Sequence, residues 1–80
     1  MTPEEAFGTV IRRHRKELEM SQEELALRCD LDRTFIGLVE RGKKSPSLKT
    51  VRKIAESLNV KISVLFKEVE QELDTYENPT

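Results

Sequence analysis

The sequence contains few of the residues on which many kinds of protein depend. Its 80 residues include one cysteine, one histidine and no tryptophan. A single cysteine cannot form an intramolecular disulfide, and together with one histidine it cannot complete a metal site. No apolar run is long enough for a signal peptide or a membrane span, so we expect a cytoplasmic protein that does not insert into membranes.

The patterns of catalysis and cofactor binding are missing as well. The sequence has no glycine-rich phosphate loop and no cluster of nucleophile, base and orienting acid. We therefore expect no enzymatic activity, no cofactor and no small-molecule ligand. The composition, with 36% hydrophobic and 36% charged residues, is that of a globular domain. Eighty residues suffice for one core, and at this size dimerisation often adds stability.

The charged residues are unevenly distributed, although the net charge is only −1. Residues 33–53 contain seven basic residues and one acidic residue, whereas residues 68–80 contain five acidic residues and no basic one. The small net charge argues against a protein that coats nucleic acid through bulk positive charge. The distribution, however, would let one face meet phosphates while the acidic end points away.

Residues 21–42 have the pattern of two short helices separated by a tight turn. Ser21 can cap the first helix, and Glu24 can complete a capping box with it. Asp32 can cap the second helix, of about nine residues, which ends where Gly42 can adopt the left-handed conformation.

The second of these helices would present an unusual outer face. The residues expected on it are Arg33, Thr34, Gly37, Leu38 and Arg41. Arginine can pair with guanine in the major groove, and a small residue lets a helix come close to base edges. From spacing alone, a helical hairpin that serves only as a packing unit explains the pattern equally well.

Three further helices are expected around this motif, and the fold class is therefore all-α. They cover residues 3–18 and 48–58 and a last segment capped by Ser63. The side chains expected to face the core are Phe7, Val10, Ile11, His14 and Leu18 in the first, Leu48, Val51, Ile54, Ala55 and Leu58 in the second, and Leu65 and Phe66 in the last. We predict one compact five-helix domain over residues 1–76 and a disordered tail at 77–80.

The last helix continues its apolar stripe beyond the point where so small a domain can cover it. Val69, Leu73 and Tyr76 form this continuation, and we predict that they make a dimer contact. A frayed C-terminal segment is the alternative. Cys29 is interpreted as a small core residue, and His14 as a packed or partly exposed side chain.

A series of short motifs runs from residue 11 to residue 66. They are I-R-x-x-R at 11–15, SQEELA at 21–26, I-x-x-V-E-R-G at 36–42, P-S-L at 46–48 and K-I-A-x-x-L-x-V at 53–60. This ordered set resembles the lambda-repressor/Cro-type (XRE) helix-turn-helix family. Within it, L-D-R-T-F-I at 31–36 is most similar to the controller proteins of restriction-modification systems, which often carry tyrosine in place of Phe35. The resemblance implies the lambda-repressor-like fold and a two-fold dimer whose recognition helices lie about 34 Å apart.

With this resemblance, individual residues receive roles. We assign base reading to Arg33, Thr34, Gly37 and Leu38, and phosphate binding to Gln22, Phe35, Arg41, Lys43, Lys44 and Lys49. The resemblance alone implies the role of Gln22 and a salt bridge between Arg15 and Glu40 that holds the recognition helix against the first helix. Phe35 could instead pack inward. Asp30 departs from the family, which usually has glycine at this turn.

The leading hypothesis is a sequence-specific transcriptional regulator that binds double-stranded DNA as a homodimer on a palindromic operator. RNA polymerase is a further candidate partner. One alternative is an antitoxin-type autoregulator, although the 14 residues after Phe66 leave little room for a toxin-binding tail. The other is a helical protein-interaction module that works through its acidic last helix.

Overall fold

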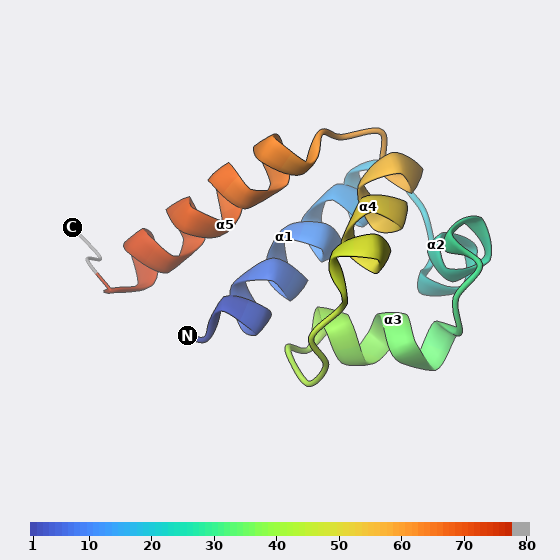
Figure 1. Ribbon diagram of the computed structural model, residues 1–80, viewed down its shortest axis with the longest axis horizontal. Helices are drawn as coiled ribbons and strands as arrows, with labels where there is room; N and C mark the ends of the chain where they lie inside the picture. The colour runs from blue at the N-terminus through green and yellow to red at the C-terminus, as the bar shows by residue number, and fades with distance from the viewer. Residues whose placement is uncertain (78–80) are drawn as a thin grey trace.

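The computed structural model describes residues 1–77, which form five helices and no strand. The helices are α1 (Pro3–Glu17), α2 (Gln22–Cys29), α3 (Arg33–Glu40), α4 (Leu48–Ser57) and α5 (Ile62–Glu77). α1 and α5 pack side by side in opposite directions, and α3 lies along the lower edge of the molecule in Figure 1. The predicted all-α five-helix architecture is confirmed.

Side-chain caps determine where four of the helices begin. The Thr2 hydroxyl accepts from the Glu5 amide at 3.1 Å, and the Glu5 carboxylate accepts from the Thr2 amide at 2.8 Å, so α1 has a complete capping box. Ser21, Asp32 and Ser47 cap α2, α3 and α4 by accepting from amides two or three residues further on.

One predicted capping box and both predicted ends of the last helix differ from the structure. At α2, Glu24 does not complete a capping box, because its carboxylate pairs with Arg28 at 2.7 Å. α5 begins at Ile62, one residue before the predicted cap Ser63. Its other end also differs, because Glu77 belongs to the helix instead of to the predicted tail, while residues 78–80 lie outside the described residues.

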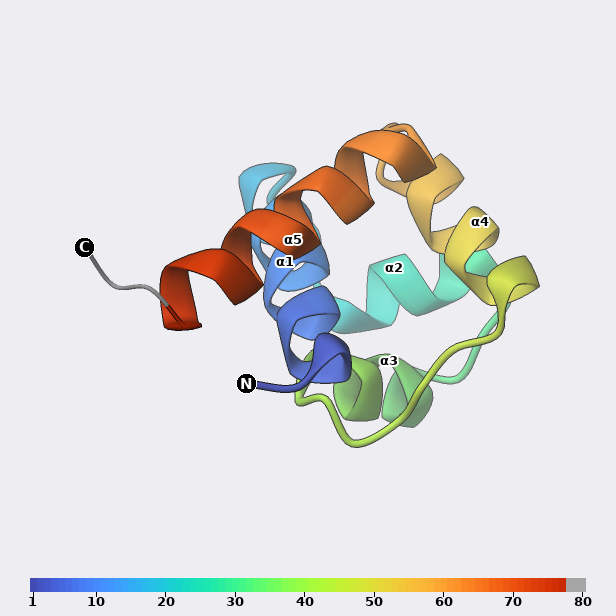
Figure 2. The same cartoon turned by 60° about the vertical axis from the view of Figure 1, so that its left-hand side comes forward.

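The core collects side chains from all five helices. Its largest fully buried members are Ile11, Leu25, Ile36, Ile54 and Leu65, and each such side chain contributes about 1.5–3 kcal/mol when it leaves water. Figure 2 shows how α1 runs through the middle of the bundle, with α5 on one side and α3 on the other.

Three residues predicted for the core lie instead at its edge. Leu18 is 50% exposed because α1 ends at Glu17 and the chain turns away there. Leu48 is 82% exposed at the first position of α4, before the turn that packs inward. Phe66 is 39% exposed, although its ring stacks on that of Phe7 with the centroids 6.0 Å apart.

The apolar stripe of α5 is covered further than the sequence predicts. Val69 is only 5% exposed and belongs to the protein's own core, and Leu73 packs partly against that core. Tyr76 is 63% exposed. The long α1 lies beside α5 and buries the part of the stripe that was predicted to need a partner, so the assignment of Val69 to a dimer contact is wrong.

Two residues at the turns of the motif have left-handed backbone conformations, and the one predicted at Gly42 is confirmed. Asp30 has φ 55° and ψ 46° between α2 and α3, and Gly42 has φ 72° after α3. Another glycine, Gly8, has a packing role that the sequence did not reveal, because a Cβ at this position would collide with the backbone carbonyls of Val39 and Glu40. Gly8 therefore lets α1 come close to the end of α3. None of the described helices is long and apolar enough to cross a membrane.

Candidate nucleic-acid interface

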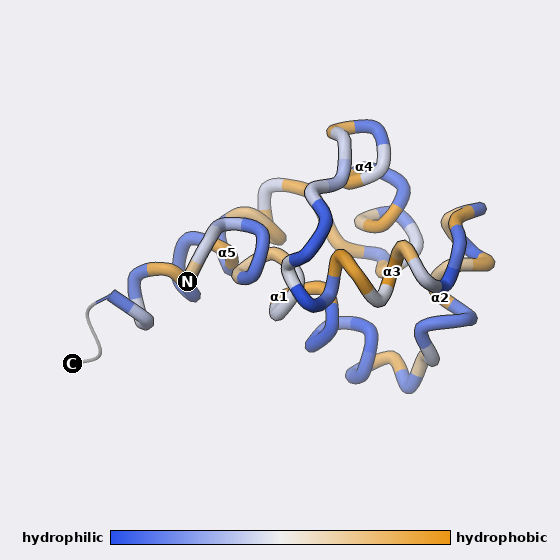
Figure 3. Tube along the Cα trace, turned by 90° about the horizontal axis from the view of Figure 1, so that it is seen from below, coloured by the Kyte–Doolittle hydropathy of each residue, from blue (hydrophilic) through white to orange (hydrophobic). Residues whose placement is uncertain are grey.

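α3 has one face in the core and one in solvent. Ile36 and Val39 are fully buried, whereas Arg33, Thr34 and Arg41 are exposed. Asp32 accepts from the Thr34 amide at 2.9 Å and so starts the helix immediately before these side chains. Figure 3, a view from below, shows α3 on this surface of the molecule. The N-terminal turn of α3 therefore presents a guanidinium and a hydroxyl to whatever approaches from this side.

The middle of α3 differs from the prediction. Gly37 is buried, and a Cβ at this position would lie 3.5 Å from Arg41 Nη1 and 3.8 Å from Gln22 Oε1. The bare backbone that we expected there is covered by two polar side chains. Leu38 is partly exposed. Phe35 is partly buried and packs against the core, so its alternative inward placement is the one observed.

A buried ion pair holds α3 against α1. Arg15 Nε lies 2.6 Å from Glu40 Oε2, and Arg15 Nη2 donates to Glu40 Oε1 at 2.9 Å. The remaining guanidinium nitrogen, Nη1, donates to the Met20 carbonyl at 2.8 Å. The two side chains are only 9% and 2% exposed, so the fork geometry is shielded from water. The salt bridge predicted from the resemblance is confirmed.

Gln22 joins this pair from α2. Its Nε2 donates to Glu40 Oε1 at 3.0 Å, so this carboxylate of α3 accepts hydrogen bonds from residues of both α1 and α2. A glutamine amide carries two N–H donors, and the second remains available for another acceptor. The sequence did not reveal this contact.

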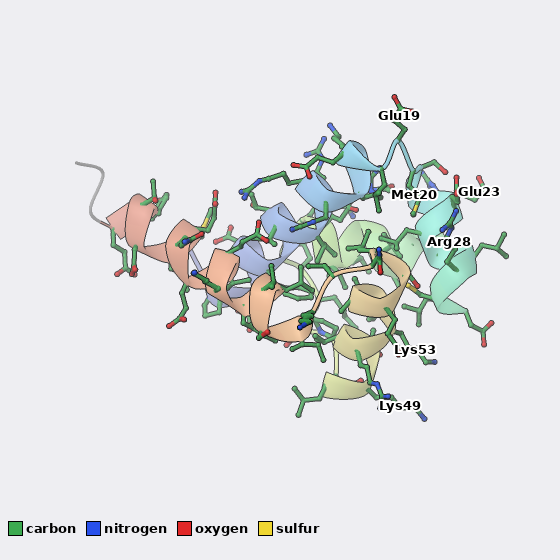
Figure 4. All side chains as sticks on the ribbon, turned by 90° about the horizontal axis from the view of Figure 1, so that it is seen from above. Glu19, Met20, Glu23, Arg28, Lys49 and Lys53 are labelled. Atoms are coloured by element: carbon green, nitrogen blue, oxygen red, sulfur yellow. The ribbon has the colours of Figure 1, made fainter. Side chains whose placement is uncertain are left out.

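The loop after α3 and the start of α4 carry cations that have no acidic partner among the described residues. Arg41, Lys43, Lys44 and Lys49 are exposed. Within residues 1–77 no carboxylate oxygen lies within 4.0 Å of these side chains or of Arg33. Lys49 and Lys53 both project outward from α4 (Figure 4). These cations are therefore free to meet an external anion.

The basic side chains between α1 and α5 face acidic partners. Arg13 Nη2 lies 2.8 Å from Glu72 Oε2, and His14 Nε2 lies 2.8 Å from Glu68 Oε2. Arg13 also approaches Glu68, at 3.9 Å. His14 is half-buried, as predicted, and over the described range no three potential metal ligands cluster together.

Cys29 is a core residue, as predicted. It is 2% exposed, and its Sγ lies 3.3 Å from the Ser57 hydroxyl. Burial raises the pKa of the Cys29 thiol. This environment is that of an inert structural cysteine.

An apolar groove lies where α1, the α3–α4 loop, α4 and α5 meet. The apolar side chains that line it are Pro3, Phe7, Pro46, Leu48, Val51 and Phe66. The predicted contact residues Leu73 and Tyr76 are not among them. The groove was not predicted from the sequence, because Leu48 and Phe66 fit the pattern of buried helix positions although both are exposed.

Comparison with known proteins places the chain in a family. Residues 11–65 match the family model described as helix-turn-helix. The control protein C.MunI from a Mycoplasma species is 40% identical over 67 residues, which are 82% of this chain and 90% of that protein. The restriction-modification controller protein C.AhdI from Aeromonas hydrophila is 38% identical, has a TM-score of 0.77, and matches over 79% of this chain and 96% of its own.

A third relative was solved on DNA. The restriction-modification controller protein C.Esp1396I, as a tetramer in complex with its natural 35-base-pair operator, has a TM-score of 0.81 and 32% identity, over 90% of this chain and 95% of its own. The family match covers more than half of the 80 residues. The chain thus belongs to the helix-turn-helix family, and its relatives include the controller proteins of restriction-modification systems.

Proposed function

We propose that this protein is a sequence-specific transcriptional regulator that binds double-stranded operator DNA as a homodimer. The observation that carries the proposal is the way in which α3 is held. The exposed cations on and just after α3 have no acidic partner within residues 1–77, and the buried Arg15–Glu40 pair fixes the orientation of the helix. Such a helix fits a major groove, in which bases are read by side chains from its N-terminal turns.

The exposed residues divide into two functions. Arg33 and Thr34 read base edges, and the partly exposed Leu38 is available to a thymine methyl group. Gly37 keeps this part of α3 narrow, because it carries no side chain of its own. The residues that hold phosphates are Gln22, Arg41, Lys43, Lys44 and Lys49.

The experiment that tests the proposal is selection of bound duplexes from a random pool, followed by sequencing. We expect a palindrome, because a two-fold dimer reads two equivalent half-sites. A protein that shows no preference among duplexes at moderate ionic strength would refute the proposal and favour the protein-interaction module.

The second copy docks at the apolar groove. Leu48 and Phe66 are 82% and 39% exposed there, and Ile62, at the start of the same helix, is 39% exposed. Ser45 and Pro46, from the loop that carries Lys43 and Lys44, line one side of the groove. Of the contact residues predicted on α5, Val69 is excluded because it is buried in the protein's own core, whereas Leu73 and Tyr76 stay predictions.

A paired substitution tests this location. Leu48→Glu with Phe66→Glu should shift the protein to monomer in sedimentation and weaken operator binding at low protein concentration. The control is Leu27→Glu, because Leu27 is 80% exposed but lies on α2, outside the groove. If the paired variant stays dimeric, the contact lies elsewhere.

We further propose that the regulated genes belong to a restriction-modification system, as the names of the relatives imply for those proteins. A match between the selected palindrome and DNA beside the protein's own gene supports this assignment. Co-purification from native cells with a stoichiometric second chain would favour the antitoxin alternative instead.

RNA polymerase is the protein partner that we propose for the DNA-bound regulator. Glu23 and Leu27 lie one turn apart on α2, and the leucine is 80% exposed. An apolar side chain so exposed is better suited to a protein partner than to a phosphate backbone. Leu27→Ala should therefore change transcription from the operator in a reconstituted assay while leaving DNA affinity unaltered.

A further inference from the structure

The basic residues in the C-terminal turns of α1 form two groups. Arg13, His14 and Arg15 each lie within 3 Å of a carboxylate oxygen. Arg12 and Lys16 are exposed, and in the part of the chain that the structure describes no carboxylate oxygen lies within 4.0 Å of either. They are four residues apart and so share one helix face. α1 therefore carries a pair of free cations outside the helix-turn-helix.

This pair lies beside the end of the recognition helix. Arg12, Lys16 and Thr9 line a shallow depression together with Glu40, the last residue of α3, and Arg13, whose guanidinium is already paired with Glu72. Gln22, for which we propose a phosphate contact, donates to the same Glu40 carboxylate. Figure 1 shows α1 rising from the C-terminal end of α3, and Gly8 of α1 lies against the backbone of Val39 and Glu40 there. The free cations of α1 and the start of α2 thus flank the same end of α3.

The acidic residue in the depression does not repel an approaching anion. The Glu40 side chain is 2% exposed, and its oxygens are occupied by Arg15 and Gln22. The depression therefore presents a guanidinium and an ammonium group to solvent, with the carboxylate charge already compensated below them. Arginine can pair with a phosphate through two parallel N–H donors, and lysine adds a mobile point charge.

We propose that Arg12 and Lys16 bind backbone phosphates of the operator next to the phosphate held by Gln22, which extends the DNA interface onto α1. This inference rests on the proposed function, since it requires that α3 occupies the major groove. The contact is independent of base sequence, so it strengthens binding to every duplex and leaves the choice of operator to α3.

The test compares two variants that lose the same charge. Arg12→Gln with Lys16→Gln removes the proposed contact, and Lys61→Gln with Lys67→Gln removes two exposed lysines outside the depression. Affinity for the selected operator and for an unrelated duplex is measured over a series of salt concentrations. Each phosphate contact contributes about 0.9 to the slope of log affinity against log salt. The α1 variant should lose a slope of about two per protomer on both duplexes, and the control variant should keep its slope.

A second measurement locates the phosphates. Ethylation of single operator phosphates should prevent binding of the wild-type protein at one group of positions. At these positions the α1 variant, which lacks the contact, should bind ethylated and unmodified DNA equally well. Thermal melting checks that both variants fold. Equal slopes and equal ethylation patterns in wild type and α1 variant would overturn the inference, as would equal slope losses in the two variants.

The outcome for the proposed function is read separately. If Arg33→Ala still loses operator preference while the α1 variant behaves as wild type, the regulator function stands and only the α1 contact is withdrawn. A wild-type protein without preference among duplexes would overturn both.

Discussion

On the α1–α5 side of the protein the cations face acids, whereas on the α3 side they face solvent. Arg13 and His14 are paired with Glu72 and Glu68 at 2.8 Å. Arg33 and the lysines of the following loop have no such partner within the described residues. A cationic surface on the α3 side is therefore compatible with a net charge of −1, because the acidic residues near the C-terminal end balance the basic residues in the sum. The arrangement of charge, more than its sum, is the reason that we propose the α3 side as the one that meets DNA.

The largest effect is expected where the two sides meet, at the buried Arg15–Glu40 pair. Glu40→Ala leaves the Arg15 guanidinium buried without its carboxylate and should lower the free energy of unfolding by about 3–5 kcal/mol. Urea denaturation measures this change. A matched Glu72→Ala variant, which opens only a partly exposed pair, should cost far less. Similar losses in both would break the distinction between the two kinds of ion pair.

Operator reading by Arg33 comes next. Arg33→Ala should weaken binding to the selected operator by about 1–3 kcal/mol and relax preference at one base-pair position, because a bidentate contact is lost. Competition among operators mutated at single positions measures it. A loss shared equally by all sequences would assign Arg33 to the backbone.

Lys44 should behave in the opposite way. Lys44→Ala removes a proposed phosphate contact, so affinity should fall alike on all duplexes, and the salt slope should decrease by about one per protomer. Titrations at several salt concentrations provide the measurement. An altered base preference in this variant would contradict the division of functions on the α3 side.

The exposed pair on the α1–α5 side should matter little. The Arg13 and Glu72 side chains are 41% and 30% exposed, and such pairs contribute about 0.2–1 kcal/mol. Arg13→Ala should lower stability by no more than this amount and leave DNA affinity at moderate salt unchanged. Lost DNA affinity in a folded variant would mean that Arg13 acts on the DNA side as well.

The smallest effect concerns Glu5, an acid close to the cationic loop. The hydrogen bond from the Thr2 amide lowers the pKa of Glu5, and the charge of Lys43 acts in the same direction. Because the folded-state pKa is lowered, this stabilisation is present above the ordinary glutamate pKa of about 4.3 and is lost as the pH falls through the lowered value. The stability difference between wild type and Glu5→Gln should be constant at neutral pH and should shrink below about pH 4. A difference independent of pH would rule out this contribution.

The sequence predicted the features that depend on local chemistry. The caps at Ser21 and Asp32 and the left-handed turn at Gly42 follow from the conformational preferences of those residues, and all are present. The five helices follow from apolar periodicity. The Arg15–Glu40 pair was implied by family resemblance, because no local pattern joins residues so far apart in the chain.

Features that depend on how helices pack were missed. The prediction placed Val69 at a dimer contact because so small a domain was not expected to cover the whole apolar stripe of α5. In the structure α1 is long enough to cover this part of the stripe. Leu48 and Phe66 fit the core period and yet border a groove at helix ends. Gly37 was expected to be bare, but the side chains that cover it come from one turn along α3 and from another helix. Periodicity identifies a face of a helix without specifying what lies against it.

The shared Glu40 carboxylate has a mechanical consequence. α3 cannot rotate or slide without breaking hydrogen bonds to both α1 and α2, since Arg15 and Gln22 hold the same side chain. The recognition helix is thus oriented when the chain folds, long before it encounters an operator. Association then needs little ordering of the protein, and a mismatched base pair cannot be accommodated by tilting the helix. Selectivity for the operator therefore depends on the buried polar contacts of Glu40 as well as on the surface that we propose to contact DNA.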